Sequence, residues 1–457
     1  MKRITKKAIA ILLVMVMAAS VFVASAANPM ERGFLPVRVI FEDAGAEVTW
    51  NNEDRSIHVI IEGINLVLLT GAPVAYVNDE TVLLQYGVTL WENTAFINAQ
   101  DLGTVNDALI LALAGAPAER PVYEGFTDYP IIIGEGTDFP LDGILSIPDN
   151  AAAPVPAVVI VAGSGPNDMH GTIGGNTVYR DIAEFLAANG IAVIRHDKRT
   201  LTHGLRMAQE LGGSATIWEE SIEDAIFAAD ILRADPRIDA DRIFILGHSL
   251  GGMIAPRIYA NGGDFAGLIL MAGTPRHILE LTAEQIRASI YEQIALAEMA
   301  VEAGLVDAEY AAEALEAAGF DAMLADIDIL EAIFESLADM SDDEAKELQV
   351  PISGLMAYYY KDMLSNFTDY VQDITVPILV MQGGRDFQVL ADVDFVLMQE
   401  VLAGRDNVTF SLYEDLNHLF VPTTAGNFTE HAFEILFNPG RVYTQVLQDI
   451  VDWVFGL

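Results

Sequence analysis

The segment Arg242-Ile-Phe-Ile-Leu-Gly-His-Ser-Leu-Gly-Gly-Met-Ile-Ala-Pro256 decides the fold class of this chain. Its first five residues form an apolar run typical of a buried strand, and its last five can begin a helix. Between them, Gly247 and Gly251 stand two residues before and two residues after Ser249. A Gly-x-Ser-x-Gly sequence between a strand and a helix predicts a sharp turn that holds the serine hydroxyl clear of the backbone. Ser249 is therefore the candidate nucleophile. The alternative, an ordinary glycine-serine turn, does not account for the strand and helix on either side.

The composition limits the classes of protein to consider. The chain has 457 residues, which favours two domains, and its hydrophobic share of 52% supplies a sizeable core. With 66 acidic and 24 basic residues, its formal charge is -42. Such a charge repels phosphate groups, so we expect no nucleic-acid partner. The lack of cysteine excludes disulfides, thiolate chemistry and Cys-ligated metals.

The first 26 residues resemble a secretory signal peptide. Basic residues precede the apolar stretch Ala8–Val23, and Ala24-Ser-Ala26 provides the small residues that a signal peptidase accepts. We therefore expect residues 1–26 to be a cleaved leader and the protein to be secreted or held at the cell surface. An uncleaved membrane anchor is the alternative, because the apolar stretch is close to the shortest that spans a bilayer.

Short strands separated by turns are expected across residues 28–102. Ala46-Glu-Val-Thr-Trp50 and Ser56-Ile-His-Val-Ile-Ile61 flank Asn51-Asn-Glu-Asp54, which predicts a hairpin. Further strands are expected at residues 64–69 and 82–84.

This region resembles a known bacterial surface module. Gly33-Phe-Leu-Pro-Val-Arg-Val-Ile-Phe-Glu-Asp-Ala-Gly-Ala-Glu-Val-Thr-Trp50 and its echo Ala95-Phe-Ile-Asn-Ala-Gln-Asp-Leu102 are similar to the copper amine oxidase-like N-terminal domain. The resemblance implies a spacer or binding module at residues 27–115, with the cell wall or surface as candidate partner. We predict no metal site, because His58 is the only histidine before His170 and one imidazole cannot hold copper alone.

After a linker at residues 114–121, strands alternate with helices. The strand candidates, all short apolar runs, are Val155–Val161, Ile191–Ile194, Arg242–Leu246, Gly267–Met271, Val376–Met381 and Val408–Leu412. Helical patterns lie between them, as at Tyr179–Ala188 and Ile217–Ala234. The alternation predicts an α/β domain with a mostly parallel sheet and helices on both faces.

Residues 276–365 interrupt the alternation with helical patterns rich in Ala, Glu, Leu and Met. Ser341-Asp-Asp-Glu344 predicts a capping box at the start of one helix. Inserted after a sheet strand, these helices are expected to form a cap over Ser249. A helical appendage elsewhere on the surface is the alternative.

A nucleophilic serine needs a base and a third group that orients the base. In hydrolases with this turn the chain order is Ser, then Asp or Glu, then His. Asp386 follows the strand candidate at 376–381, and His418 follows the one at 408–412. We therefore predict Ser249, Asp386 and His418 as the catalytic residues.

Four nearby acids and imidazoles are interpreted as structural. Asp392 and Asp394 fall in a predicted helix and are expected to be solvated. His431 lies in an amphipathic run, and His248 is expected to pack beneath the serine.

Charge that develops on a substrate carbonyl oxygen needs backbone N–H donors fixed in advance. The amide of Leu250, directly after the nucleophile, is one candidate. Val161-Ala-Gly-Ser-Gly-Pro166 has glycines that allow close approach of backbone to substrate, and the amide of Ser164 is the other candidate.

Residues 122–457 resemble the bacterial α/β-hydrolases of the dienelactone-hydrolase and serine-aminopeptidase-like branch. The segments that carry the resemblance are Val159–Asp168, Ile194–Thr200, Ile245–Gly252 and Met381–Val389. It implies an eight-stranded sheet with a helical cap and a Ser-Asp-His machinery. Many relatives have His where this chain has Ala162, which puts the anchoring of the following loop in question. The basic run Arg195-His-Asp-Lys-Arg199 is interpreted as a brace beneath the site, through pairs such as Asp197 with a neighbouring Arg.

Together these features predict a carboxylesterase-type serine hydrolase that cleaves short- to medium-chain acyl esters through an acyl-serine. No cofactor is expected, and the partner is a small-molecule ester. A peptidase or acyltransferase with the same residues remains open, as does a surface-binding protein whose hydrolase domain is only a scaffold.

Overall fold

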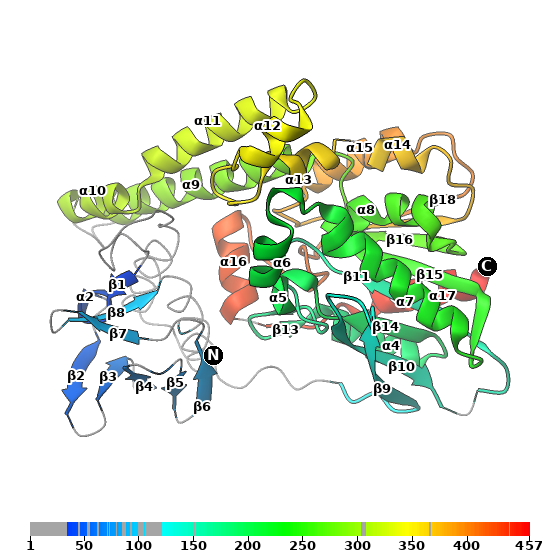
Figure 1. Ribbon diagram of the computed structural model, residues 1–457, viewed down its shortest axis with the longest axis horizontal. Helices are drawn as coiled ribbons and strands as arrows, with labels where there is room; N and C mark the ends of the chain where they lie inside the picture. Colours follow the sequence, from blue (N-terminus) through cyan, green and yellow to red (C-terminus); the bar gives the residue numbers. More distant parts are fainter. Residues whose placement is uncertain are drawn as a thin grey trace. The chain divides into compact units, whose positions relative to one another are not determined.

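The computed structural model (Figure 1) describes residues 34–43, 46–52, 55–61, 64–70, 72, 74–78, 80–84, 88–91, 94–98, 105, 121–149, 151–302, 308–364, 367–437 and 439–457. The expected leader at 1–26 and all but the last residue of the expected linker lie outside these ranges. The chain separates into two compact units. One comprises residues 1–118, 293–323 and 436–439, and the other residues 119–292, 324–435 and 440–457.

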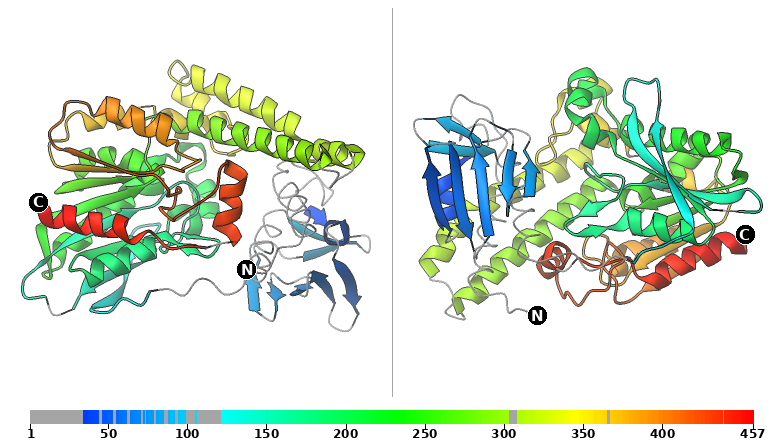
Figure 2. Two further views of the ribbon diagram at one scale, coloured as in Figure 1. Left: turned by 180° about the vertical axis from the view of Figure 1, so that it is seen from behind. Right: turned by 90° about the horizontal axis from the view of Figure 1, so that it is seen from below.

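The N-terminal unit contains two antiparallel sheets. The larger has the strand order β2-β3-β4-β5-β6, and these strands lie side by side in Figure 2. Its strands are β2 (Glu47–Asn51), β3 (Ser56–Ile61), β4 (Ile64–Leu69), β5 (Val74–Val77) and β6 (Glu80–Leu83). The smaller sheet has the order β1-β8-β7. It consists of β1 (Phe34–Pro36), β7 (Val88–Trp91) and β8 (Thr94–Asn98), with helix α2 (Val37–Asp43) after β1.

The predicted hairpin is confirmed by the pairing of β2 with β3, in which Glu47 lies opposite Ile60. Side chains along β4 alternate between buried and partly exposed, so one face of this sheet covers a core. Phe41 and Leu66 are fully buried in that core. The echo motif begins in β8, and its residues 99–102 lie outside the described residues.

The second unit is built on an eight-stranded sheet with the order β18-β17-β16-β15-β11-β14-β10-β9. The strands are β9 (Phe126–Ile133), β10 (Leu141–Pro148), β11 (Val155–Val161), β14 (Ala192–His196), β15 (Ile238–His248), β16 (Gly267–Met271), β17 (Ile378–Gly383) and β18 (Val408–Tyr413). The strands β11, β14, β15, β16, β17 and β18 run parallel to one another. β10 pairs antiparallel with both β14 and β9. The expected mostly parallel sheet is confirmed.

Each strand predicted in this unit is present, but some begin or end at other residues because hydrogen bonding to the neighbouring strand sets the boundary. β11 and β16 have the predicted bounds. β17 begins later than expected because Pro377 lacks the N–H that a central strand must donate. It continues to Gly383, which still pairs with Tyr413 of β18.

Helices cover both faces of the sheet (Figure 2). On one face, α4 (Val178–Ala188) and α17 (Thr444–Gly456) share a core with apolar side chains of the central strands. On the other, α7 (Glu223–Ala234) and α8 (Leu250–Ile258) pack against β15. Further elements outside the cap are α5 (Arg199–Thr202), α6 (Gly204–Glu210), α15 (Val396–Val401), α16 (Phe428–Phe437), the short hairpin β12 (Thr172–Ile173) and β13 (Asn176–Thr177), and the short helices η2 (Gly212–Ser214), η3 (Trp218–Ile222), η4 (Tyr259–Gly263) and η5 (Ala391–Phe395).

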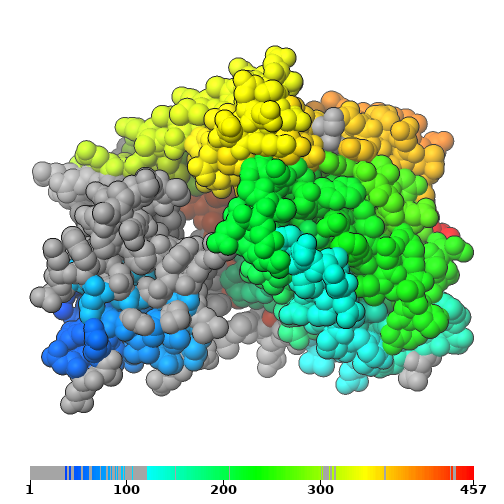
Figure 3. All heavy atoms as spheres, viewed as in Figure 1, coloured from blue at the N-terminus to red at the C-terminus, as the bar shows by residue number. Residues whose placement is uncertain are grey.

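The expected helical insertion lies between β16 and β17. Its helices are α9 (Ile278–Glu302), α10 (Ala308–Ala317), α11 (Phe320–Ser336), α12 (Asp342–Glu347), α13 (Ala357–Asp362) and α14 (Phe367–Val371). The predicted capping box is present at α12, where Ser341 Oγ accepts from the Glu344 N–H and the Glu344 carboxylate accepts from the Ser341 N–H at 3.0 Å. In Figure 3 the yellow part of the insertion lies against the green surface formed by residues near 200–220. None of the helices described is both long and apolar enough to cross a membrane.

Candidate active site

Ser249 occupies the sharp turn between β15 and α8 that the sequence predicts. Its φ is 55° and its ψ is -119°, a conformation that a residue with a side chain rarely adopts. A Cβ on Gly247 would lie 2.2 Å from the carbonyl oxygen of Gly251, and a Cβ on Gly251 would lie 2.2 Å from that of Val161. Both glycines are therefore required by the close passage of backbone on either side of the serine.

Asp386 and His418 meet at the ends of two adjacent strands. Asp386 follows β17, His418 follows β18, and Nδ1 of His418 lies 2.7 Å from Oδ2 of Asp386. The other carboxylate oxygen accepts the N–H groups of Gln388 and Val389 at 2.8 and 3.0 Å. Burial alone would raise the pKa of Asp386, but His418 and these two N–H donors together hold it below its usual value. An ionised Asp386 keeps the proton of His418 on Nδ1 and leaves Nε2 as the basic nitrogen.

Ser249 and His418 line one cavity of about 170 Å³. Among the described residues, the Ser249 side chain makes no hydrogen bond, and the His418 ring is hydrogen bonded through Nδ1 alone. The His418 ring also packs against His248, with ring centroids 4.9 Å apart. Such catalytic contacts are often long in a free enzyme and tighten when substrate binds. The structure therefore brings together all three residues predicted for catalysis, two in direct contact and the third in the same cavity.

The two predicted backbone donors border the same cavity. Ser164 and Leu250 both line it. Leu250 is the first residue of α8, where an N–H has no acceptor one turn earlier in the helix. Gly163 approaches the nucleophile so closely that a Cβ there would lie 3.2 Å from Cβ of Ser249. This places the Gly163–Ser164 segment beside the position that a substrate carbonyl must reach.

The loop after β11 is well anchored although Ala162 replaces the histidine of many relatives. The Gly163 N–H donates to the Tyr179 hydroxyl at 2.9 Å, and Nζ of Lys198 donates to the Gly163 carbonyl at 2.8 Å. Asn167 Nδ2 donates to the Ser164 carbonyl at 2.8 Å. The loop that follows Ala162 is thus anchored by side chains that the sequence analysis did not identify for this role. Lys198 stands in the basic run interpreted as a brace, whereas Tyr179 carried no signal beyond its place in an expected helix.

Tyr179 also connects this loop to the histidine beside the nucleophile. The Tyr179 hydroxyl lies 3.3 Å from Nδ1 of His248, and Nε2 of His248 lies 2.9 Å from the carbonyl oxygen of His418. Because that carbonyl only accepts, His248 carries its proton on Nε2, and its Nδ1 accepts a hydrogen bond from the Tyr179 hydroxyl. Burial, with His418 nearby, lowers the pKa of His248 to about 3 and keeps the ring neutral. The expectation that His248 packs beneath the serine is confirmed, with the added role of a hydrogen-bonded link.

Two expectations about charged residues are wrong. Asp394 is fully buried, not solvated, because its carboxylate binds Arg276 at 2.8 and 2.9 Å and Thr274 at 2.5 Å. Asp392 is exposed as expected.

Asp197 does not pair with a neighbouring arginine among the described contacts. It accepts the N–H of Met169 at 2.8 Å. The ion pairs of the basic run are formed instead by Lys198 with Glu220 and by Arg199 with Asp224 and Glu223, each at 2.6 Å. Arg195 also lies 3.7 Å from Asp128. The basic run therefore forms buried ion pairs, as a brace would, but with other partners than predicted.

The cap helix α9 contributes to the cavity that contains Ser249. Ile278, Leu281, Thr282 and Gln285 of this helix line it. Gln285 also donates to the carbonyl of Gln388, in the loop that carries Asp386, at 2.7 Å. The first turns of α9 therefore border the cavity beside Ser249.

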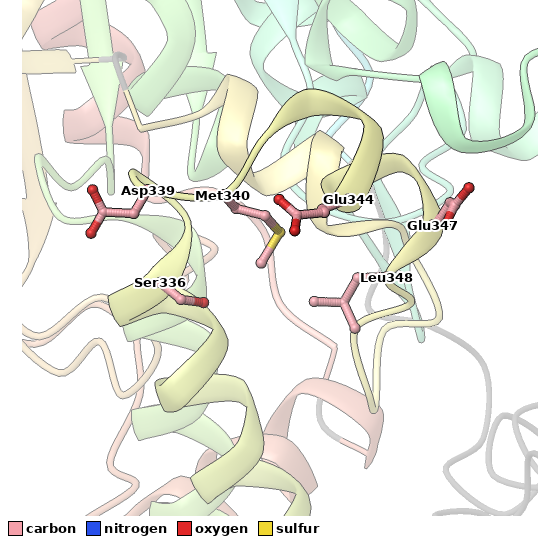
Figure 4. A pocket seen from close by; sticks show the side chains of 6 residues that line it. All are labelled: Ser336, Asp339, Met340, Glu344, Glu347 and Leu348. Atoms are coloured by element: carbon pink, nitrogen blue, oxygen red, sulfur yellow. The ribbon is translucent and has the colours of Figure 1, made fainter.

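An open surface depression of about 560 Å³ lies on the cap and is shown in Figure 4. It is lined by Ser336, Asp339, Met340, Glu344, Glu347 and Leu348. This set contains carboxylates but no imidazole or amine that could act with them, so we do not assign the catalytic chemistry to it. Within the described part of the chain, no group of three His, Asp or Glu side chains is placed to hold a metal ion.

The strand order, the serine turn and the paired Asp386 and His418 define the class of α/β-hydrolases. Comparison with known families agrees, because residues 168–421 match the serine aminopeptidase S33 family model. The chain belongs to this family. Residues 19–110 match the copper amine oxidase N-terminal domain, as the N-terminal motifs suggest.

Individual relatives include esterases and peptidases. The chain is similar to esterase EstD of Thermotoga maritima, with 31% identity over 315 residues, which is 69% of this chain and 65% of the relative. It thus spans just under two thirds of that protein. Among solved structures, Est1E from Butyrivibrio proteoclasticus has 14% identity and a TM-score of 0.41, covering 73% of this chain and 100% of its own. The acylaminoacyl peptidase of Pyrococcus horikoshii has 15% identity and a TM-score of 0.40, covering 81% of this chain and 52% of its own.

Proposed function

We propose that this protein is a carboxylesterase-type serine hydrolase with Ser249, His418 and Asp386 as nucleophile, base and orienting carboxylate. The observation that carries the proposal is the 2.7 Å contact between His418 and Asp386 beside the cavity lined by Ser249. The similarity to an esterase over 69% of the chain supports the ester as substrate.

In the first step, Ser249 Oγ bonds to the ester carbonyl carbon and its proton passes to Nε2 of His418. The carbonyl electron pair moves onto oxygen, where the N–H groups of Leu250 and Ser164 stabilise the charge. When the C=O bond forms again, the bond to the alkoxy oxygen breaks. The alcohol leaves with the proton from His418, and the acyl group remains on Ser249.

In the second step, water repeats the attack on the acyl carbon while His418 takes one of its protons. The Ser249 oxygen departs with that proton and the carboxylic acid is released. Asp386 stays ionised throughout and balances the charge of the imidazolium. All of these groups belong to the chain, so the proposed cycle requires no cofactor.

The cavity favours acyl groups of short to medium length. An engineered protein cavity of about 150 Å³ holds one benzene molecule, and the cavity beside Ser249 measures about 170 Å³. Apolar walls from Met253, Ile278 and Leu281 suit a hydrocarbon chain.

The test compares hydrolysis of p-nitrophenyl butyrate by the wild-type protein and by Ser249→Ala. We expect the substitution to lower kcat by about 10⁴-fold or more because the nucleophile is lost, with the circular dichroism spectrum unchanged. A fluorophosphonate probe and peptide mapping should place the label on Ser249. Normal turnover by Ser249→Ala, or a label elsewhere, would refute the assignment.

A peptidase is the second candidate, and the observation that favours it is the match to the serine aminopeptidase S33 family. Aminoacyl p-nitroanilides distinguish the two, since an esterase of this kind should turn them over far more slowly than the butyrate ester. Transfer of the acyl group to an added alcohol would indicate an acyltransferase.

We further propose that the protein is exported and that residues 27–115 act as a module for contact with the cell wall or surface. The basic and apolar pattern of residues 1–26 supports export. Expression in a secreting bacterial host, followed by N-terminal sequencing, should give a mature chain beginning near residue 27. A chain that retains residue 1 in the membrane fraction would favour the uncleaved anchor instead.

A further inference from the structure

One buried lysine touches the loop that supplies a predicted backbone donor. Lys198 follows β14, its side chain is 3% exposed, and its Nζ donates to the Gly163 carbonyl at 2.8 Å. The same Nζ lies 2.6 Å from a carboxylate oxygen of Glu220. A charged amine that is this deeply buried is costly unless it is paired and hydrogen bonded, and here both conditions are met.

The bond to Gly163 determines where the next N–H points. The Gly163 carbonyl and the Ser164 N–H belong to one planar trans peptide, so they point in opposite directions. Lys198 holds the carbonyl on the buried side, together with Asn167 at 3.2 Å. The Ser164 N–H is thereby directed away from Lys198, and Ser164 lines the cavity of Ser249.

The positive charge acts on the same peptide through polarisation. A cation at the carbonyl oxygen draws electron density from the peptide and strengthens its N–H as a donor. In a site from which water is excluded, such an effect is larger than in solvent. A peptide that is held and polarised before substrate arrives needs no rearrangement when the oxyanion forms.

The cap takes part in holding this lysine. Tyr359 of the cap helix α13 lies close to Glu220, and burial together with that carboxylate raises the pKa of the Tyr359 phenol well above its usual value. The phenol therefore keeps its proton at neutral pH and adds no negative charge beside Glu220. A continuous line of contacts leads from the cap through Glu220 and Lys198 to the Gly163 carbonyl.

We propose that Lys198 is a positioning residue of the oxyanion site, which orients and polarises the Gly163–Ser164 peptide so that its N–H stabilises the transition state. Glu220 keeps the amine in place. This inference rests on the proposed serine-hydrolase function and adds a residue that acts through the backbone rather than on substrate.

The experiment replaces the ion pair by a neutral pair of similar size, Lys198→Met with Glu220→Gln, so that no buried charge is left alone. We expect kcat/KM for p-nitrophenyl butyrate to fall about 10- to 100-fold, less than the 10²–10³ that loss of a donor costs. The inhibition constant of an aliphatic trifluoromethyl ketone, whose adduct carries the oxyanion, should weaken by the same factor. KM should change by less than about threefold, because ground-state binding does not use this N–H.

Arg199→Met with Asp224→Asn is the matched control, because it likewise replaces a buried ion pair by a neutral pair. Asp224 is fully buried, and its ion pair with Arg199 in the same basic run contacts no atom of the loop among the described hydrogen bonds. We expect kcat/KM and ketone inhibition to remain within about twofold of wild type. An equal loss in the control, or a loss of kcat/KM in the double variant without weaker ketone inhibition, would overturn the proposal.

Two further measurements test the proposal if the double variant does not fold, and separate the role of Lys198 from the choice of substrate. If the double variant does not fold, Glu220→Gln alone should loosen Lys198 and weaken ketone inhibition, and unchanged inhibition overturns the proposal. The rate at which a fluorophosphonate labels Ser249 reports on the same oxyanion site in any serine hydrolase. A wild-type protein that is labelled but does not cleave the ester would contradict the proposed substrate, whereas a labelling rate unaffected by the double substitution would contradict the role of Lys198.

Discussion

At the scale of single residues, Ser249 is held in a backbone conformation that costs free energy, and its surroundings maintain it. The φ of 55° is tolerated because Gly247 and Gly251 let the backbone pass within a distance that any Cβ would forbid. Asp386 is stabilised in the ionised form by His418 and by main-chain donors, so the imidazole has one orientation available.

Replacement of Asp386 by Asn tests that orientation. The amide can no longer act as a full acceptor for Nδ1–H and favours the wrong tautomer of His418. We expect kcat for p-nitrophenyl butyrate to fall by about 10³- to 10⁴-fold. Stopped-flow or steady-state kinetics with the folded variant measures this, and a loss below tenfold would contradict the assigned role.

Tyr179→Phe tests the link between the loop after β11 and His248. Without the hydroxyl, the Gly163 N–H and Nδ1 of His248 lose their buried partner. We expect the free energy of unfolding to fall by about 1–3 kcal/mol and kcat to fall with little change in KM. Chemical denaturation and ester kinetics give both values. Tyr291→Phe, at an exposed position, should change neither; a Tyr179 variant that matches it would show that the link has no effect.

At the scale of elements, each catalytic side chain stands just beyond the carboxyl end of a parallel strand. Ser249 follows β15, Asp386 follows β17 and His418 follows β18, and adjacent parallel strands bring these ends to one edge of the sheet. Chain order and apolar runs were enough to predict this arrangement. The prediction that Asp394 is solvated is wrong because the local sequence is typical of an exposed helix. The partner that buries Asp394 is Arg276, which is distant in the sequence.

Helix α16 carries His431, a buried imidazole that packs against Phe387 and whose Nε2 has no hydrogen-bond partner among the described residues. Burial lowers the pKa of His431 to about 4 from the usual 6.5. Below pH 6.5 the unfolded chain therefore binds a proton at His431, whereas the folded chain binds this proton only near pH 4. The stability contributed by this group is complete above pH 6.5 and is lost as the pH falls toward 4.

His431→Leu should remove this part of the acid sensitivity. Between pH 7.5 and pH 5, the wild-type free energy of unfolding should decrease by about 2 kcal/mol more than that of the variant. Urea denaturation at the two pH values measures the difference. Identical decreases in the two proteins would show that His431 does not titrate as described.

At the scale of the whole molecule, the chain combines an antiparallel β module with an α/β-hydrolase sheet that carries a helical insertion between β16 and β17. The formal charge of -42 affects the solubility of the protein and the partners it can bind, but it does not determine the fold. The acyl-enzyme cycle proposed here uses an alcohol, an imidazole and a carboxylate that all belong to the hydrolase unit.

EDTA tests the cycle on the complete protein. Because no step of the proposed cycle uses a metal, we expect turnover of p-nitrophenyl butyrate in excess EDTA to equal that of the untreated enzyme. Loss of activity that is restored by an added divalent cation would contradict the proposed mechanism.

The amino-acid sequence alone determined the class of fold, the turn at Ser249 and the order of Ser249, Asp386 and His418, because these depend on local patterns and on how short parallel strands must connect. Only the tertiary structure decided which side chains hold the loop at Gly163 and which carboxylates neutralise the buried cations. Tyr179, Lys198 and Glu220 are separated along the chain, and their contacts arise from packing between elements that no local pattern encodes.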